Sequence, residues 1–170
     1  MAASSSAPYR ARVRALLRAV VVLVVVLGLD QLTKHTIAES TTAREGRNVF
    51  FFVKLVRVRN RGVAFGFFSG GGVPVLVFTV VALALLLAYF LRHPERHGLW
   101  LPTGLLVGGA LGNVVDRLAS GAVTDFIKLP LWPAFNIADT AITLGVLSLI
   151  WVLDTRERTE PVTQRPEAGH

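Results

Sequence analysis

Four long apolar stretches constrain the fold of this 170-residue chain more than any other feature. They cover residues 13–34, 73–91, 99–115 and 135–153, and the second contains no charged residue. A helix needs about 20 predominantly apolar residues, in a range of roughly 17 to 25, to cross the hydrocarbon core of a membrane. Each stretch meets that length. The sequence therefore predicts an all-α membrane protein with four transmembrane helices.

Composition supports this interpretation. The chain is 52% hydrophobic and only 17% charged, with a mean hydropathy of +0.55, whereas soluble domains carry about 25% charged residues. Its length fits a single integral-membrane domain over residues 1–170, with disordered tails at about 1–10 and 155–170. The absence of cysteine excludes disulfides, a thiolate nucleophile and cysteine-ligated metals.

The first apolar stretch is predicted to be a retained span. Arginines precede it as in a secretory signal, but it ends in Asp30-Gln31-Leu32-Thr33-Lys34, without the small residues of a cleavage site. Four spans place both termini on one side of the membrane. Lysines and arginines divide nine to eight between the two sides, so their total does not set the orientation. The first span usually does, and its upstream arginines favour cytoplasmic termini.

Two local patterns predict how the spans are connected and packed. Residues 56–59 alternate valine with arginine, which is typical of a strand, and Asn60-Arg61-Gly62 favours a turn. We therefore expect a small β-element on the extracytoplasmic surface. Gly104, Gly108 and Gly112 share one face of the third span, where small residues let a neighbouring helix approach closely.

Four aspartates are candidates for function, because a carboxylate at membrane depth is costly. Threading the spans alternately places Asp30 and Asp116 at the outer ends of the first and third spans. Asp139 falls one turn inside the outer start of the fourth span, and Asp125 falls in the loop between the third and fourth. All four therefore converge near the outer leaflet boundary.

This convergence favours chemistry at a membrane surface over transport, whose ionisable site is expected near the bilayer midplane. Two neighbouring carboxylates can share a proton, so that one activates water while the other polarises a carbonyl. Arg117 directly follows Asp116 and favours a charged, structurally paired carboxylate there. Apolar neighbours make Asp125 and Asp139 the better pair, although sequence neighbours alone leave Asp116 as an alternative.

Five motifs occur in order between the spans. They are Asp30-Gln31-Leu32-Thr33-Lys34, Asn60-Arg61-Gly62-Val63-Ala64-Phe65, Gly108-Gly109-Ala110-Leu111-Gly112-Asn113-Val114-Val115-Asp116-Arg117, Val123-Thr124-Asp125-Phe126 and Phe135-Asn136-Ile137-Ala138-Asp139. Together they resemble the bacterial lipoprotein signal peptidase family, also called signal peptidase II, over residues 30–147.

The resemblance implies an aspartic endopeptidase of the plasma membrane that cuts prolipoproteins before a diacylglyceryl-modified cysteine. It implies Asp125 and Asp139 as the catalytic pair and a small extracytoplasmic β-cradle. It also implies residues that support the pair and the substrate: Asp30, Lys34, Asn60, Asn113, Asp116, Arg117 and Asn136. No metal or organic cofactor is expected. The expected partners are prolipoproteins and membrane lipids, with no nucleic acid, and the protein is expected to be a monomer.

Simpler interpretations of the same residues stay open. Asp30 and Lys34, four residues apart on a helix, could form only an interfacial ion pair. Asn113 and Asn136 could serve only as hydrogen-bonding contacts between helices. The alternative functions are a small four-helix proton-coupled transporter and a scaffold without chemistry.

Overall fold

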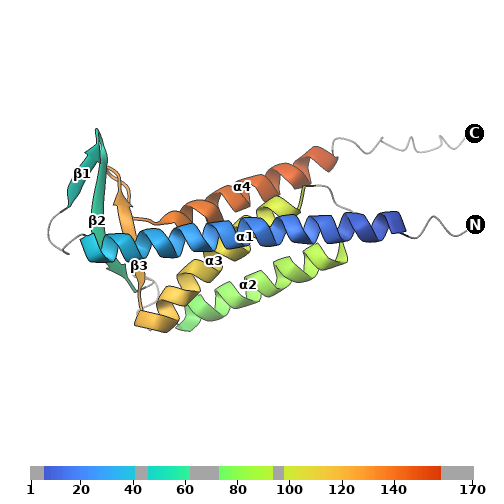
Figure 1. Ribbon diagram of the computed structural model, residues 1–170, viewed down its shortest axis with the longest axis horizontal. Helices are drawn as coiled ribbons and strands as arrows, with labels where there is room; N and C mark the ends of the chain where they lie inside the picture. The colour runs from blue at the N-terminus through green and yellow to red at the C-terminus, as the bar shows by residue number, and fades with distance from the viewer. Residues whose placement is uncertain (1–5, 41–45, 62–72, 94–97, 158–170) are drawn as a thin grey trace, which may run out of the picture.

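The described part of the chain forms a bundle of helices with a small sheet at one end (Figure 1). The computed structural model describes residues 6–40, 46–61, 73–93 and 98–157. Each predicted span forms one helix: α1 is Ser6–Ser40, α2 is Val73–Arg92, α3 is Trp100–Ser120 and α4 is Ile137–Glu157. The start of α1 and the end of α4 lie at the end of the bundle away from the sheet (Figure 1).

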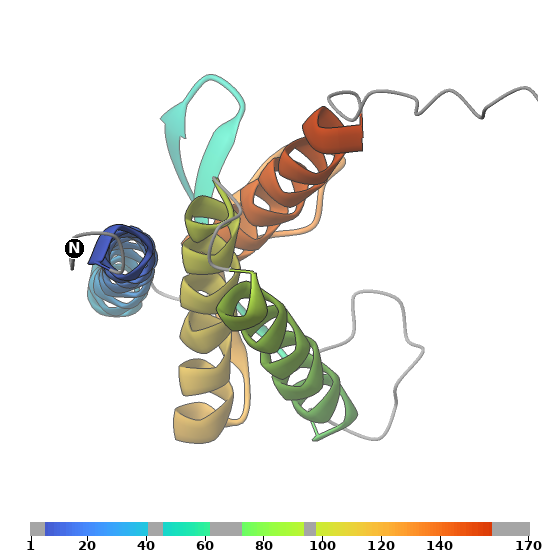
Figure 2. The same cartoon turned by 90° about the vertical axis from the view of Figure 1, so that its right-hand side faces the viewer.

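Helix α3 is the centre of the bundle and packs against α1, α2 and α4 (Figure 2). Its glycines make this possible. A Cβ atom added at Gly104 would lie 2.7 Å from the Ala19 carbonyl oxygen of α1, and one at Gly109 would lie 2.5 Å from the Ala138 oxygen of α4. Gly108 and Gly112 likewise face α1. The close packing predicted for the glycine face of α3 is confirmed, and Gly109 extends it to α4.

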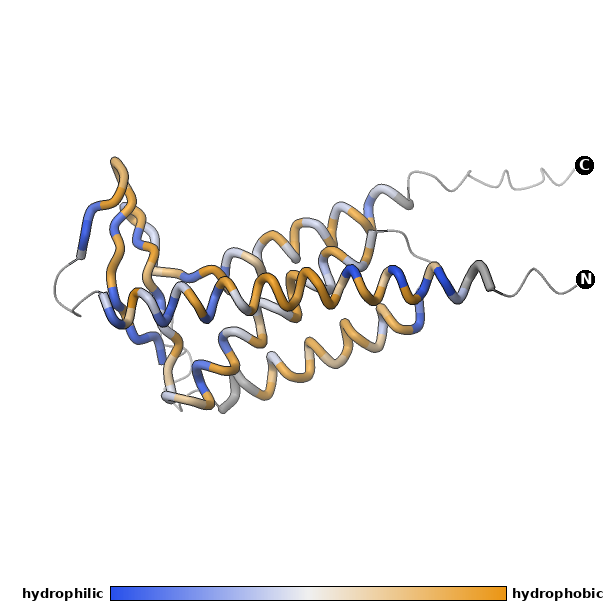
Figure 3. Tube along the Cα trace, in the orientation of Figure 1, coloured by the Kyte–Doolittle hydropathy of each residue, from blue (hydrophilic) through white to orange (hydrophobic). Residues whose placement is uncertain are grey.

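Two described helical segments, Tyr9–Ser40 and Ile137–Thr155, are long and apolar enough to cross a membrane. The apolar part of α2, Val77–Arg92, is shorter, and α3 carries glycines and polar residues. The surface of α1 is apolar for most of its length (Figure 3). Its exposed large apolar residues are Val13, Leu16, Leu17, Val20, Val21, Val24, Val25, Leu29 and Leu32. Such a surface fits lipid rather than water.

The sheet has three antiparallel strands in the order β1-β2-β3, with β1 at Arg47–Phe50, β2 at Val53–Asn60 and β3 at Val123–Lys128. The strand predicted over residues 56–59 is confirmed as part of β2. Asp125 lies between the third and fourth helices, as predicted, but in strand β3 rather than in an irregular loop, and it pairs with Val58. Both faces of β3 are partly covered, so its sequence lacks the alternation of a half-exposed strand.

The helices extend beyond the predicted spans. Residues 6–10 and 155–157, which we expected to be disordered, are helical. The start of α1 is rich in alanine and arginine, which favour helix without needing an apolar face. The rest of the predicted tails and the predicted turn at Gly62 lie outside the described residues.

Candidate active site

The start of α4 is held by two reciprocal hydrogen bonds between Asn136 and Asp139. The Asp139 backbone N–H donates to Asn136 Oδ1 at 2.8 Å, and the Asn136 backbone N–H donates to Asp139 Oδ2 at 3.3 Å. This is the capping-box pattern, with asparagine as the N-cap and aspartate three residues later. Asp139 therefore lies in the first helical turn, as predicted, and its carboxylate is fixed in direction.

Asp125 lies within hydrogen-bonding distance of the same cap. Its side chain is 1% exposed. Asn136 Nδ2 donates to Asp125 Oδ1 at 2.8 Å, and Asn60 Nδ2, from the end of β2, donates to Asp125 Oδ2 at 3.0 Å. The pKa of Asp125 is raised from 3.8 to about 6, chiefly by burial; the nearby charge of Asp139 adds to the rise, and the hydrogen bonds from Asn60 and Asn136 oppose it. Asn136 thus connects the two predicted catalytic carboxylates.

A buried ion cluster from α1 lies behind this pair. Lys34 Nζ is 2.7 Å from Asp30 Oδ2 and 3.1 Å from Asp116 Oδ2. Asp30 is fully buried, and its Oδ1 accepts the Ala138 backbone N–H of α4 at 2.9 Å. Asp116 Oδ2 also accepts the Thr124 backbone N–H of β3 at 2.9 Å. The cluster therefore joins α1, α3, β3 and the start of α4.

Asn113 connects the ion cluster to Asp139. Its Oδ1 accepts hydrogen bonds from Lys34 Nζ at 3.2 Å and Asn136 Nδ2 at 3.1 Å. Its Nδ2 donates to Asp139 Oδ1 at 2.8 Å. Two carboxylate oxygens of Asp139 therefore have fixed donors, one from α3 and one from its own helix cap.

The predicted pairing of Asp116 with Arg117 is wrong. Asp116 contacts Lys34 instead, because adjacent helical residues point about 100° apart while Lys34 faces Asp116 across the α1 and α3 contact. Arg117 Nη1 donates to the Asn113 carbonyl oxygen at 3.3 Å. Within the described residues its Nε is buried without a hydrogen-bond partner.

Gln31 is a member of the site that sequence reasoning missed. Its Nε2 lies 3.2 Å from Asp30 Oδ2, from Asp116 Oδ1 and from the Gly112 carbonyl oxygen. Gln31 stands next to Asp30 inside the first motif. Its position, as a polar residue at the end of an apolar stretch, is the signal that could have identified it as part of the site. The resemblance implies roles for Asp30 and Lys34 of this motif, but none for Gln31.

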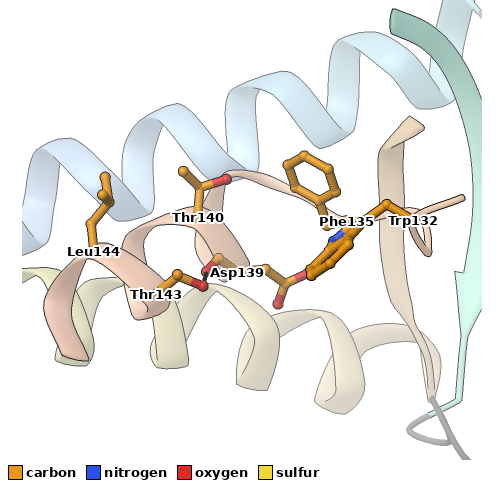
Figure 4. Close-up of a pocket in the computed structure, with 6 residues that line it drawn as sticks. All are labelled: Trp132, Phe135, Asp139, Thr140, Thr143 and Leu144. Carbon is orange, nitrogen blue, oxygen red and sulfur yellow. Dashed lines mark hydrogen bonds between the residues drawn. The ribbon is translucent and has the colours of Figure 1, made fainter. Parts of the chain in front are cut away.

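Each aspartate of the pair borders its own pocket. A pocket of about 260 Å³ is lined by Asp139 and by residues of α4 and the segment before it: Trp132, Phe135, Thr140, Thr143 and Leu144 (Figure 4). A second, of about 360 Å³, is lined by Asp125 with Asn60, both arginines beside it, and residues 58, 133 and 134. No cluster of three metal-ligating side chains occurs in the residues that the structure describes. Both members of the predicted pair thus border a pocket, although the Asp125 side chain itself is buried.

Comparison with solved structures places the chain among bacterial membrane enzymes. It is similar to one such enzyme solved by the in meso method with a TM-score of 0.78 and 30% identity, over 86% of this chain and 93% of the other. A second gives a TM-score of 0.65 and 30% identity, over 79% and 91% of the two chains.

Sequence comparison then gives the family. Residues 22–154 match the model for signal peptidase (SPase) II. The chain is 38% identical to the lipoprotein signal peptidase of Halothermothrix orenii, over 82% of this chain and 96% of the relative. It is 41% identical to that of an Azoarcus species, over 91% and 90% of the two chains. The chain belongs to the signal peptidase II family of aspartic-type peptidases. These matches give no support to the transporter alternative.

Proposed function

We propose that this protein is an aspartic endopeptidase that removes signal peptides from prolipoproteins, cutting before a diacylglyceryl-modified cysteine. One observation carries the proposal: Asp125 from β3 and Asp139 from α4 are joined by the Asn136 side chain, and each borders an open pocket. The activity named for the relatives is that of a lipoprotein signal peptidase.

The pair would act on a water molecule held between the two carboxylates. The ionised member takes a proton from water, whose oxygen attacks the scissile carbonyl carbon, while the protonated member donates a hydrogen bond to the carbonyl oxygen. The tetrahedral intermediate then collapses as the C–N bond breaks, and the leaving amine takes a proton from the pair. This mechanism needs no metal or organic cofactor.

The surrounding residues would divide into those that hold the pair and those that face the substrate. Asp30, Lys34, Asn113 and Asp116 hold the pair through the start of α4 and through β3. Asn60 faces the substrate side, because it lines the second pocket together with the two arginines beside it, and Arg117 is proposed to help position the substrate backbone. The Arg117 Nε–H, which has no partner within the described residues, would donate a hydrogen bond to a carbonyl oxygen of the substrate backbone.

The four helices are proposed to cross the bacterial plasma membrane, with both termini cytoplasmic and the sheet outside. The apolar surface of the helices would hold the lipid chains and the signal helix of the substrate. We further propose a monomer, because the pair is complete within one chain.

The test is cleavage of a diacylglyceryl-modified prolipoprotein by reconstituted protein. Asp125→Asn and Asp139→Asn keep the size of the side chain but cannot pass a proton, so we expect each to slow cleavage by about 100-fold to 10,000-fold. Thr36→Ala, on the exposed end of α1, is the matched control and is expected to cleave normally. Cleavage at the wild-type rate by either aspartate variant would overturn the assignment.

A further inference from the structure

The tip of the β1–β2 hairpin exposes four consecutive apolar residues. Val49, Phe50, Phe51 and Phe52 are 55%, 69%, 84% and 72% exposed. The Phe50 and Phe51 rings lie edge to face at 4.8 Å between centroids, so they form a small aromatic cluster that touches little else. Figure 3 shows the hairpin tip as a hydrophobic segment, whereas the rest of the sheet contains both hydrophobic and hydrophilic residues. We call residues 49–52 the aromatic tip.

The backbone at the tip is unfavourable for the side chain it carries. Phe50 pairs with Val53, so Phe51 and Phe52 form a two-residue hairpin loop. Phe51 has a φ of 26°, in the left-handed region where glycine is the usual residue of such a loop. A glycine would make the turn with less strain. The large side chain at this position therefore points to a role outside the folding of the hairpin.

The charges around the tip favour an anionic surface. Arg47 and Lys54 are exposed at the base of the tip. Across the hairpin, Arg47 pairs with Leu55 and Lys54 pairs with Asn48. The two strands contain no acidic residue. Long basic side chains beside exposed apolar groups suit a phospholipid interface, where the apolar part enters the acyl boundary and the charge stays at the headgroups.

The position of the tip agrees with a lipid surface as its partner. The strands run across the helix axes at the sheet end of the bundle, and the tip projects to the side of the bundle in both views (Figures 1 and 2). It thus extends in the direction of the membrane plane rather than away from it. The surface of α1 is apolar up to Leu32, which is 65% exposed.

We propose that the aromatic tip inserts into the outer leaflet of the membrane at the level of the headgroups and anchors the sheet there, with Arg47 and Lys54 on anionic lipid phosphates. The anchor has a consequence for the site. Strand β2 begins beside the tip and ends at Asn60, whose side chain donates to Asp125. Fixing the tip in the lipid therefore fixes the height of that hydrogen bond above the membrane. The membrane location rests on the proposed function.

Because the chain contains no cysteine, single cysteines can carry a nitroxide spin label without background. The test compares Phe51→Cys with two references, His35→Cys on the exposed outer end of α1 and Val24→Cys on its lipid-facing surface. Each labelled protein is placed in vesicles of phosphatidylcholine with or without phosphatidylglycerol. Collision with oxygen reports lipid, and collision with a water-soluble nickel chelate reports water.

We expect the label at position 51 to collide more with oxygen than the His35 label and less than the Val24 label, and to lie deeper in anionic vesicles. The double variant Phe50→Ser and Phe52→Ser should move it toward water. A label as accessible to nickel as that at His35 would overturn the proposal. Protection that appears only when prolipoprotein is added would overturn it too and assign the tip to substrate. The measurement involves no cleavage, so its outcome is independent of the catalytic assignment.

Discussion

Asn136 is the residue on which the candidate site depends most directly. Its side-chain oxygen caps α4, and its side-chain nitrogen donates both to Asp125 and to Asn113. A single amide thus sets the start of one helix and the orientation of a carboxylate from another element. An amide can do this because it carries a donor and an acceptor on one small planar group.

These two roles of Asn136 can be separated by substitution. Asn136→Ala removes both, whereas Asn136→Ser keeps a capping oxygen but removes the amide nitrogen that donates to Asp125. We expect serine to recover about 1 kcal/mol of stability relative to alanine, with cleavage slow in both variants. Thermal unfolding in detergent and cleavage of prolipoprotein measure the two effects. Recovery of cleavage together with stability would show that capping alone is required.

Asp125 should make stability depend on pH. Its pKa is about 6 in the folded protein against an ordinary 3.8, because burial disfavours the charged carboxylate. The folded state therefore binds the proton more tightly, so this contribution to stability is fully present below 3.8 and is lost as the pH rises through about 6. Between about pH 4 and pH 6, the melting temperature of the wild type should fall relative to that of Asp125→Asn. Parallel curves for the two proteins would contradict this origin.

At the scale of elements, α3 brings the site together because its glycines let α1 and α4 approach its backbone closely. Gly109 lets the start of α4 lie against α3, and Gly112 leaves space for Asp30: a Cβ there would lie 2.5 Å from Asp30 Oδ2. Larger residues would separate α1 and α4, and the ion cluster and the capping box would no longer meet. The glycines therefore support the candidate site as well as helix packing.

Gly109→Ala tests this packing. Its Cβ would meet the Ala138 backbone oxygen, which cannot rotate away, so we expect a loss of about 1–3 kcal/mol of stability and slower cleavage. Gly28→Ala is the matched control, since a Cβ there meets nothing within 4 Å. It should gain up to about 1 kcal/mol through helix propensity. Equal melting temperatures for the two variants would contradict the packing argument.

How well the elements could be predicted depended on the signal that each carries. The helices were predictable because the cost of exposing backbone in lipid forces apolar stretches into helices. Strand β3 was missed because both of its faces are partly covered, which removes the alternation that identified β2. The positions of Asp125 and Asp139 followed from motif resemblance and from their apolar neighbours. The role of Gln31 and the pairing of Asp116 with Lys34 depend on how helices face each other, which no local pattern encodes.

The whole molecule has a polarity along its long axis. The candidate site and the sheet lie at one end, and the start of α1 and the end of α4 lie at the other (Figure 1). Apolar contacts among Ala19, Phe90 and Leu99 close the bundle away from the aspartates. The end away from the sheet thus holds an apolar core cluster, and the sheet end holds the candidate site.

This polarity predicts which surfaces face outward. In intact cells stripped of their wall, a membrane-impermeant maleimide should label His35→Cys but not Tyr9→Cys, which should react only after the membrane is opened. Both side chains are exposed in the structure, at 73% and 68%, so burial cannot account for a difference. Labelling of Tyr9→Cys from outside would reverse the proposed topology.

Two carboxylates, Asp139 of α4 and Asp30 of α1, accept hydrogen bonds at the start of α4 and differ in their proposed roles. Asp139 closes the first helical turn with the same group that is proposed to gain and lose a proton in each catalytic cycle. When that group is neutral, its interaction with the positive end of the helix weakens. Asp30 holds the Ala138 N–H of the same turn and is itself paired with Lys34, so the turn keeps an acceptor that takes no part in the proposed proton transfer. The helix start can thus tolerate a momentary loss of charge without unwinding.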